Sequence, residues 1–200
     1  MSPEQLDAAL SRFKSDVKAD RRAASRQLVS DLVDPLVISR AKQRWVETTP
    51  RNARRCDSLY RIYPDMKLVN MIRDGRDVAA SIVSRGWGSD EFLTALDVWF
   101  ERMMQAHNAM ARIPADQTLT LQLEDLVNND RETSYDKLFA FLGIHDSNPT
   151  RNYFEAKMNS ENGHLNRWVQ SVDPSMRDTV TKKYAEMLAR LDDAGVTRPH

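Results

Sequence analysis

The chain has 200 residues, and its 29 lysine and arginine residues balance 29 aspartate and glutamate residues, so no bulk charge draws it to nucleic acid or to an anionic membrane. No apolar run approaches the ~20 residues that cross a bilayer, residues 1–20 are too charged for a signal peptide, and Cys56 is the lone cysteine. We therefore expect a cytoplasmic, single-domain protein without an intramolecular disulfide or a nucleic-acid or membrane partner.

Residues 1–44 are predicted to form N-terminal helices, distinct from residues 45–200. The first helix has an apolar stripe at helical spacing, and the helical pattern breaks near Asp34-Pro35 because proline lacks the backbone N–H that a helix interior needs. The stripe consists of Leu6, Leu10, Phe13 and Val17. A short helix that includes Cys56 and Leu59 should precede the first strand.

The segment Lys67–Arg85 reads as a strand followed directly by a helix. Residues 67–72 contain the apolar run of a buried strand, and helical spacing begins at Asp77. Asp77, Ser81 and Arg85 then fall on one helix face, four residues apart. A helix start carries unpaired N–H groups and partial positive charge, so this junction suits an anion such as phosphate.

Helices and a second strand follow. Residues 89–91 should open the longest helix, which stops before Pro114, and residues 118–123 should form a strand parallel to the first. Another helix should end at Gly143, and Pro174 should lie in the first turn of the last helix. The expected fold class is α/β, helix-rich, with a small parallel sheet.

Arg73, Ser81 and Arg85 are the candidate phosphate ligands, because guanidinium and hydroxyl donors would surround an anion at the start of the helix. A plainer alternative is a charged turn in which Arg73 pairs with Asp74 or Asp77 and Arg85 lies on the surface.

The motif RDGRDVAAS, residues 73–81, resembles the 3′-phosphate-binding segment of sulfotransferases that use 3′-phosphoadenosine 5′-phosphosulfate (PAPS), where an arginine and a serine eight positions later hold the 3′-phosphate. Arg85 matches a further arginine of the bacterial and tyrosylprotein-type branch. Three more blocks are similar to the family in the same order: Trp45–Pro50 with Tyr63–Asp65, Leu119–Leu126 with Leu138–Ile144, and Asn162–Trp168. The resemblance extends from about Trp45 to Leu191, and it implies a truncated P-loop-like sulfotransferase fold in which Arg167 and Trp168 close over the nucleotide.

One part of the family pattern has no counterpart here. Sulfotransferases have an N-terminal glycine-containing loop that wraps the 5′-phosphosulfate, whereas no glycine precedes Gly75 in this chain. In addition, Thr48 stands where some members have a lysine, and Leu123 stands where the family has a tyrosine. The chain thus resembles a sulfotransferase that lacks this loop, as a fragment, a mis-started product or a natural remnant, which argues against activity of this chain alone.

The resemblance implies transfer of a sulfuryl group from PAPS to a hydroxyl or amine of a small-molecule, peptide or glycan acceptor, with adenosine 3′,5′-bisphosphate (PAP) as the product. Glu47 is the one candidate for the general base, and no metal site is expected. Trp87, Trp99 and Tyr153 suit an acceptor pocket or a core equally.

Two other interpretations remain open: a non-catalytic PAP-binding or helical interaction protein derived from a sulfotransferase, and an accidental resemblance. Since a two-stranded sheet is marginal alone, we also expect weak stability, or cover from the N-terminal helices or from a second copy in a homo-oligomer.

Overall fold

A computed structural model describes residues 2–86 and 91–200, so the predicted helix start at Ser89–Asp90 and the candidate pocket residue Trp87 lie outside the described residues. Residue contacts divide the chain into two compact units, Met1–Met66 and Lys67–His200. The sequence-based boundary between residues 44 and 45 stays a prediction.

The first unit is helical. It contains α1 (Pro3–Asp16), α2 (Arg21–Ser39), a 3₁₀ turn (Asn52–Arg55) and α3 (Cys56–Ile62). Ser2 and Gln5 form a reciprocal capping box at α1, and the Asp20 side chain caps α2 by accepting two backbone N–H bonds. The short helix that was predicted before the strand is α3.

The predicted break at Asp34-Pro35 is wrong, because α2 continues through Pro35 to Ser39. The actual break lies between Asp16 and Arg21, where Asp20 starts α2. Proline removes one helical hydrogen bond, but Pro35 is exposed, so water can take the place of the missing donor.

The second unit contains the sheet. Strands β1 (Leu68–Ile72) and β2 (Thr118–Gln122) pair in parallel, with Leu68 opposite Thr118 and Ile72 opposite Gln122. The crossover between them consists of α4 (Gly75–Arg85) and α5 (Phe92–Met110). The predicted strands, their parallel pairing and the helix-rich α/β class are confirmed.

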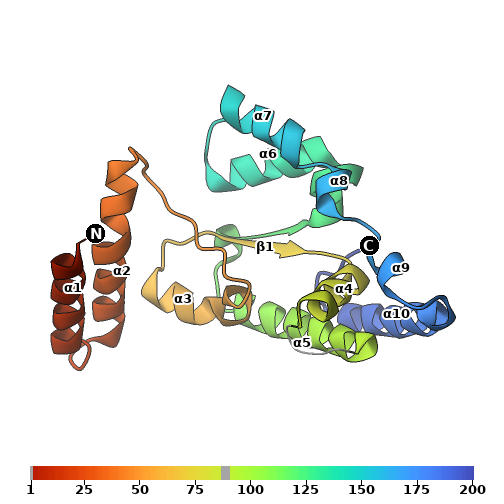
Figure 1. Ribbon diagram of the computed structural model, residues 1–200. Helices are drawn as coiled ribbons and strands as arrows, with labels where there is room; N and C mark the ends of the chain where they lie inside the picture. The colour runs from red at the N-terminus through yellow and green to blue at the C-terminus, as the bar shows by residue number, and fades with distance from the viewer. Residues whose placement is uncertain (1, 87–90) are drawn as a thin grey trace. The chain divides into compact units, whose positions relative to one another are not determined.

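Helix α4 begins two residues earlier than predicted. Asp74 is the residue that caps it, and its carboxylate accepts a hydrogen bond from the Arg76 backbone N–H at 2.8 Å. Asp77 therefore lies inside the first turn of the helix. Figure 1 shows β1 running directly toward this start of α4.

Shorter elements complete the unit. They are a 3₁₀ turn (Ala115–Gln117), a π-helical turn (Asp125–Asn129), α6 (Arg131–Leu142), α7 (Asn148–Lys157), α8 (Ser160–Gly163), α9 (Trp168–Ser171), a 3₁₀ turn (Pro174–Met176) and α10 (Arg177–Asp193). As predicted, α6 ends at Gly143, which takes a left-handed conformation with φ of 60°. The last helix also follows Pro174 as predicted.

The main core lies among α4, α5, α9 and α10, which meet in Figure 1. Its fully buried side chains include Leu96, Val180 and Leu191. Trp99 belongs to this core, whereas the Tyr153 side chain is 63% exposed, so neither provides a sign of a pocket. Burying these apolar side chains stabilises the four helices that surround the β1–α4 junction.

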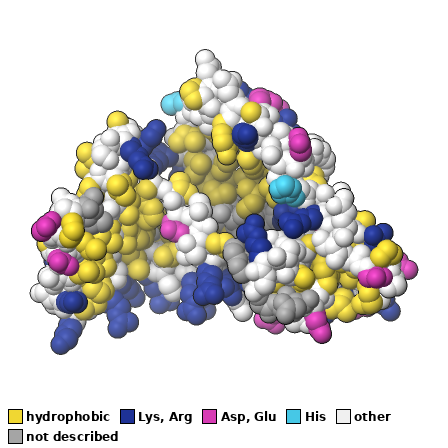
Figure 2. Space-filling model, viewed as in Figure 1, with side chains coloured by type: hydrophobic (Ala, Val, Ile, Leu, Met, Phe, Trp, Pro, Cys, Tyr) yellow, Lys and Arg dark blue, Asp and Glu magenta, His cyan; other side chains and the backbone are white. Residues whose placement is uncertain are grey.

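The surface in Figure 2 shows Lys and Arg side chains interspersed with apolar ones. Among the residues that the structure describes, no helix has both the length and the apolar character needed to cross a membrane.

Candidate functional site

The β1–α4 junction is built around Gly75. A Cβ atom on Gly75 would lie 2.5 Å from Cδ2 of Trp99, so only glycine lets α4 approach α5 this closely. The Gly75 backbone N–H donates to the Tyr184 hydroxyl at 3.2 Å, which joins the start of α4 to α10. The junction is therefore fixed by packing on two neighbouring helices.

Arg76 points into the protein. Its guanidinium lies 4.6 Å from the centre of the Trp168 ring and 4.7 Å from that of Tyr184, and it pairs with Asp74 at 2.6 Å. Burial by itself would lower the pKa of Arg76, but the hydrogen bond and the charge of Asp74 raise the pKa overall. Arg76 thus stabilises the junction by charge pairing and cation–π contact.

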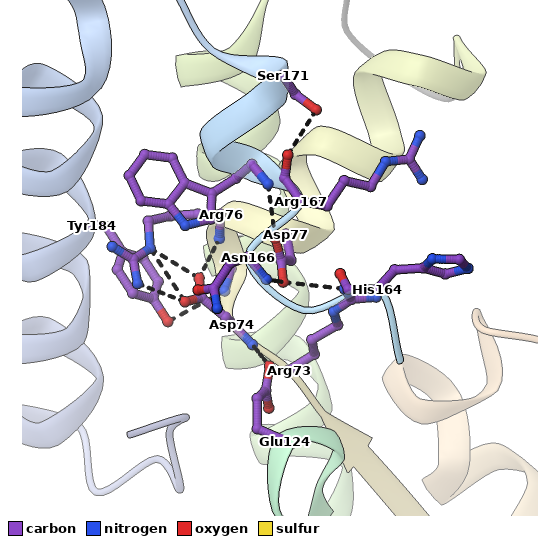
Figure 3. Close-up of polar contacts among 12 residues, drawn as sticks. Arg73, Asp74, Arg76, Asp77, Glu124, His164, Asn166, Arg167, Ser171 and Tyr184 are labelled. Carbon is purple, nitrogen blue, oxygen red and sulfur yellow. Dashed lines mark hydrogen bonds and ion pairs between the residues drawn. The ribbon is translucent and has the colours of Figure 1, made fainter. Parts of the chain in front are cut away.

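Asp77 is almost fully buried, with an exposed fraction of 2%. Its Oδ1 accepts the backbone N–H of Trp168 at 2.9 Å, and its Oδ2 accepts the backbone N–H of Asn166 at 2.9 Å and Nη2 of Arg73 at 3.1 Å. Figure 3 shows this carboxylate in the middle of the polar cluster. Three donors, one of them cationic, compensate the cost of burying the charge.

Arg73 contacts the same segment as Asp77. Its Nη2 donates to Asp77 and also to the His164 carbonyl oxygen at 2.6 Å. The buried Nε has no partner among the described residues. The pair with Asp77 that was considered from the sequence is therefore present, and it leaves one buried guanidinium donor without an acceptor.

Ser81 follows Asp77 along α4, and Arg85 follows Ser81. Each step of four residues is about 6 Å along the helix axis, because a residue rises about 1.5 Å. Ser81 is half-buried and Arg85 is exposed. The structure thus brings Arg73 to the start of the face that carries Ser81 and Arg85, and their role as phosphate ligands stays a prediction.

Arg167 and Trp168 differ in exposure. Arg167 is exposed, and Figure 3 shows its side chain pointing away from Asp77. Trp168 is 7% exposed and belongs to the main core, and its Nε1 is buried without a partner among the described residues. The predicted closing of both side chains over a nucleotide stays a prediction.

Glu124 contacts the same β1–α4 junction, and the sequence did not predict this contact. It follows the end of β2, and its Oε1 accepts the backbone N–H of Asp74 at 2.9 Å. Its Oε2 is buried and has no partner among the described residues. Parallel strands end at the same sheet edge, which is the signal that could have placed Glu124 beside the β1–α4 junction.

Glu47 belongs to the first unit, where it is exposed and accepts the backbone N–H of Thr49 at 2.6 Å. Hydrogen bonds from Thr49 lower the pKa of Glu47, which makes its carboxylate a weaker base. The described residues contain no group of three or more His, Cys, Asp or Glu side chains that could hold a metal ion.

Comparisons with known protein sequences test the family resemblance of this chain. The sulfotransferase family model matches residues 3–149. This match includes the helices before Trp45, so the expected start of the resemblance at about Trp45 is wrong. No curated protein sequence matches the chain.

Among solved structures, the chain is similar to the "Sulfotransferase Domain from the Curacin Biosynthetic Pathway", with a TM-score of 0.54 and 14% sequence identity over 94% of this chain and 79% of that chain. At this identity the likeness shows the fold alone. The family match, which spans most of the chain, shows more: this protein belongs to the sulfotransferase family.

Proposed function

We propose that this chain binds PAPS and its product PAP through the β1–α4 junction, and that the activity of which this site is a part is sulfuryl transfer to an acceptor hydroxyl or amine. The observation that carries the proposal is the position of Arg73 and Ser81, eight residues apart on a strand end and the following helix, in a chain of the sulfotransferase family. The proposed ligands of the 3′-phosphate are Arg73, Ser81 and Arg85.

The unpartnered Nε of Arg73 supports this assignment. A guanidinium has five N–H donors, and both hydrogen bonds of Arg73 use Nη2. An oxygen of the 3′-phosphate would supply an acceptor to the donors that remain, in a charge-assisted hydrogen bond. The Asp77 carboxylate lies on the same helix face, but its three donors offset its repulsion of an anion.

In the proposed reaction, the acceptor oxygen or nitrogen attacks the sulfur of PAPS in line. A bond from the acceptor to sulfur forms, the bond from sulfur to the 5′-phosphate oxygen breaks, and PAP leaves with that electron pair. The acceptor proton passes to a general base, for which Glu47 remains the candidate from the sequence. Catalysis of this kind depends on positioning and on cations that face the developing charge.

In this proposal, the chain provides the residues that bind the 3′-phosphate of PAPS. A glycine-containing loop for the 5′-phosphosulfate is not among its residues, because no glycine precedes Gly75. We therefore propose that this chain binds PAP but transfers sulfate slowly or not at all without a further segment.

Calorimetric titration with PAP and a PAPS turnover assay test the proposal together. We expect saturable binding of PAP, and tighter binding of PAP than of adenosine 5′-phosphate, which lacks the 3′-phosphate. Equal affinity for the two nucleotides would overturn the assignment of the junction to the 3′-phosphate. Binding without turnover would support a PAP-binding remnant, whereas turnover would show that other residues replace the missing loop.

A further inference from the structure

We propose that Asp77 is a positioning residue: its buried carboxylate fixes Arg73 and the segment 164–168 against the start of α4, and through Arg73 it sets the affinity for the 3′-phosphate. The inference rests on the function proposed above. It assigns Asp77 no contact with the nucleotide.

The contacts of Asp77 join two distant parts of the chain. The backbone donors Asn166 and Trp168 lie 89 and 91 residues after Asp77, whereas Arg73 lies four residues before it. Arg73 donates in addition to the carbonyl of His164, so that guanidinium, carboxylate and segment form a closed set of hydrogen bonds. Figure 3 shows Asp77 between Arg73 and Asn166.

Two residues of the segment that Asp77 contacts have a left-handed backbone conformation. His164 and Asn166 both have positive φ, of 50° and 57°, an uncommon conformation that histidine and asparagine adopt more readily than most other non-glycine residues. Residues in this conformation persist where their surroundings determine the fold of the backbone. The N–H of Asn166 donates to Asp77 in this conformation, so the carboxylate holds the segment in place.

A carboxylate suits this position better than an amide. All of its partners are donors, and an ionised carboxylate presents only acceptors. An asparagine would turn an NH₂ group toward at least one of them. The negative charge also holds the guanidinium of Arg73, a long side chain that would otherwise lose rotamer entropy when it binds phosphate.

The test compares the wild type with Asp77→Asn, Arg73→Gln and the double variant, by titration with PAP and with adenosine 5′-phosphate. We expect Asp77→Asn to weaken PAP binding about tenfold and to leave adenosine 5′-phosphate binding within about twofold. Because Asp77 acts through Arg73, the double variant should bind PAP no more weakly than Arg73→Gln. Asp97→Asn, which removes an exposed partner of Lys183, is the matched control and should bind both nucleotides as the wild type does.

Unchanged PAP affinity in Asp77→Asn, an equal loss for both nucleotides, or full additivity with Arg73→Gln would each overturn the positioning role. If the wild type itself does not prefer PAP, the proposed function fails instead. Amide hydrogen exchange then decides whether Asp77 holds the segment: in the wild type, the N–H groups of Asn166 and Trp168 should exchange slowly. Rapid exchange of both would contradict the inference even if Asp77→Asn fails to fold.

Discussion

The backbone N–H of Trp168 donates to Oδ1 of Asp77 at 2.9 Å, across 91 residues of sequence. This bond joins the first turn of α4 to the start of α9, beside the guanidinium of Arg76, which stacks on the Trp168 ring. Asp77 and Arg76 lie on different faces of α4, and both contact Trp168. Asp77 accepts its backbone N–H, and Arg76 contacts its ring. The packing of α9 and the charge arrangement at the proposed phosphate site therefore depend on each other.

Gly75→Ala should destabilise the second unit by about 1–3 kcal/mol, because the added Cβ would lie 2.5 Å from the Trp99 ring, and an overpacked core must shift. Urea-induced unfolding measures this cost. Ser84→Ala, on the exposed side of the same helix, is the control and should change the free energy of unfolding by less than about 0.5 kcal/mol. Equal stability of Gly75→Ala and the wild type would mean that α4 and α5 are not in this close contact.

Arg76→Lys should lower the free energy of unfolding by about 1–2 kcal/mol, although it keeps the charge. Lysine lacks the planar guanidinium that contacts the rings of Trp168 and Tyr184 while pairing with Asp74. Thermal unfolding followed by near-ultraviolet circular dichroism reports on both rings.

Arg198→Lys serves as the comparison for this change. Its pair with Asp192 is partly exposed to solvent, and its second hydrogen bond, to the Pro199 carbonyl oxygen at 3.1 Å, is one that an ammonium group can also donate, so the expected loss is at most about 0.5 kcal/mol. A loss for Arg76→Lys no greater than that for Arg198→Lys would argue against the stacked arrangement.

Tyr135 should make stability depend on pH in the alkaline range. Burial and a hydrogen bond to Asp146 raise the pKa of Tyr135 to about 12, above the value of about 10 in an unfolded chain. Between these values the folded protein keeps a proton that the unfolded chain has lost. The contribution is therefore fully present below about pH 10 and is lost as the pH rises through about 12.

Unfolding titrations at several pH values should show this loss in the wild type, and Tyr135→Phe should reduce it. Part of the loss should remain, because burial also raises the pKa of Tyr184 and of Tyr63. Tyr153→Phe, at a side chain that is 63% exposed, should retain it. The same pH dependence in the wild type and in Tyr135→Phe would show that Tyr135 ionises as an ordinary tyrosine.

The local elements of the second unit were accessible from the sequence. The apolar run before Arg73, the helical spacing after it and the glycine at 143 predict β1, α4 and the end of α6, because each depends on residues a few positions apart. The predicted break at Pro35 is wrong because it rests on a local rule alone, which disfavours proline inside a helix. Pro35 is exposed, so water reduces the free-energy cost of the hydrogen bond that proline removes.

The contacts of the site were not accessible in the same way. The spacing placed Asp77, Ser81 and Arg85 on one face, but it could not show that Asp77 is buried or that its acceptors meet the N–H groups of residues 166 and 168. Glu124 likewise meets the N–H of Asp74 only because the two strands pair in parallel. Such contacts arise from tertiary packing, which one sequence does not encode as a short-range pattern.

The affinity of Arg73→Gln for PAP tests the central claim most directly. Glutamine is shorter and uncharged, so it cannot supply a charge-assisted bond to the 3′-phosphate. In calorimetric titrations, the wild type should bind PAP at least about tenfold more tightly than the variant, while both bind adenosine 5′-phosphate equally. Equal affinity of the wild type and Arg73→Gln for PAP would contradict the assignment of this junction to the 3′-phosphate.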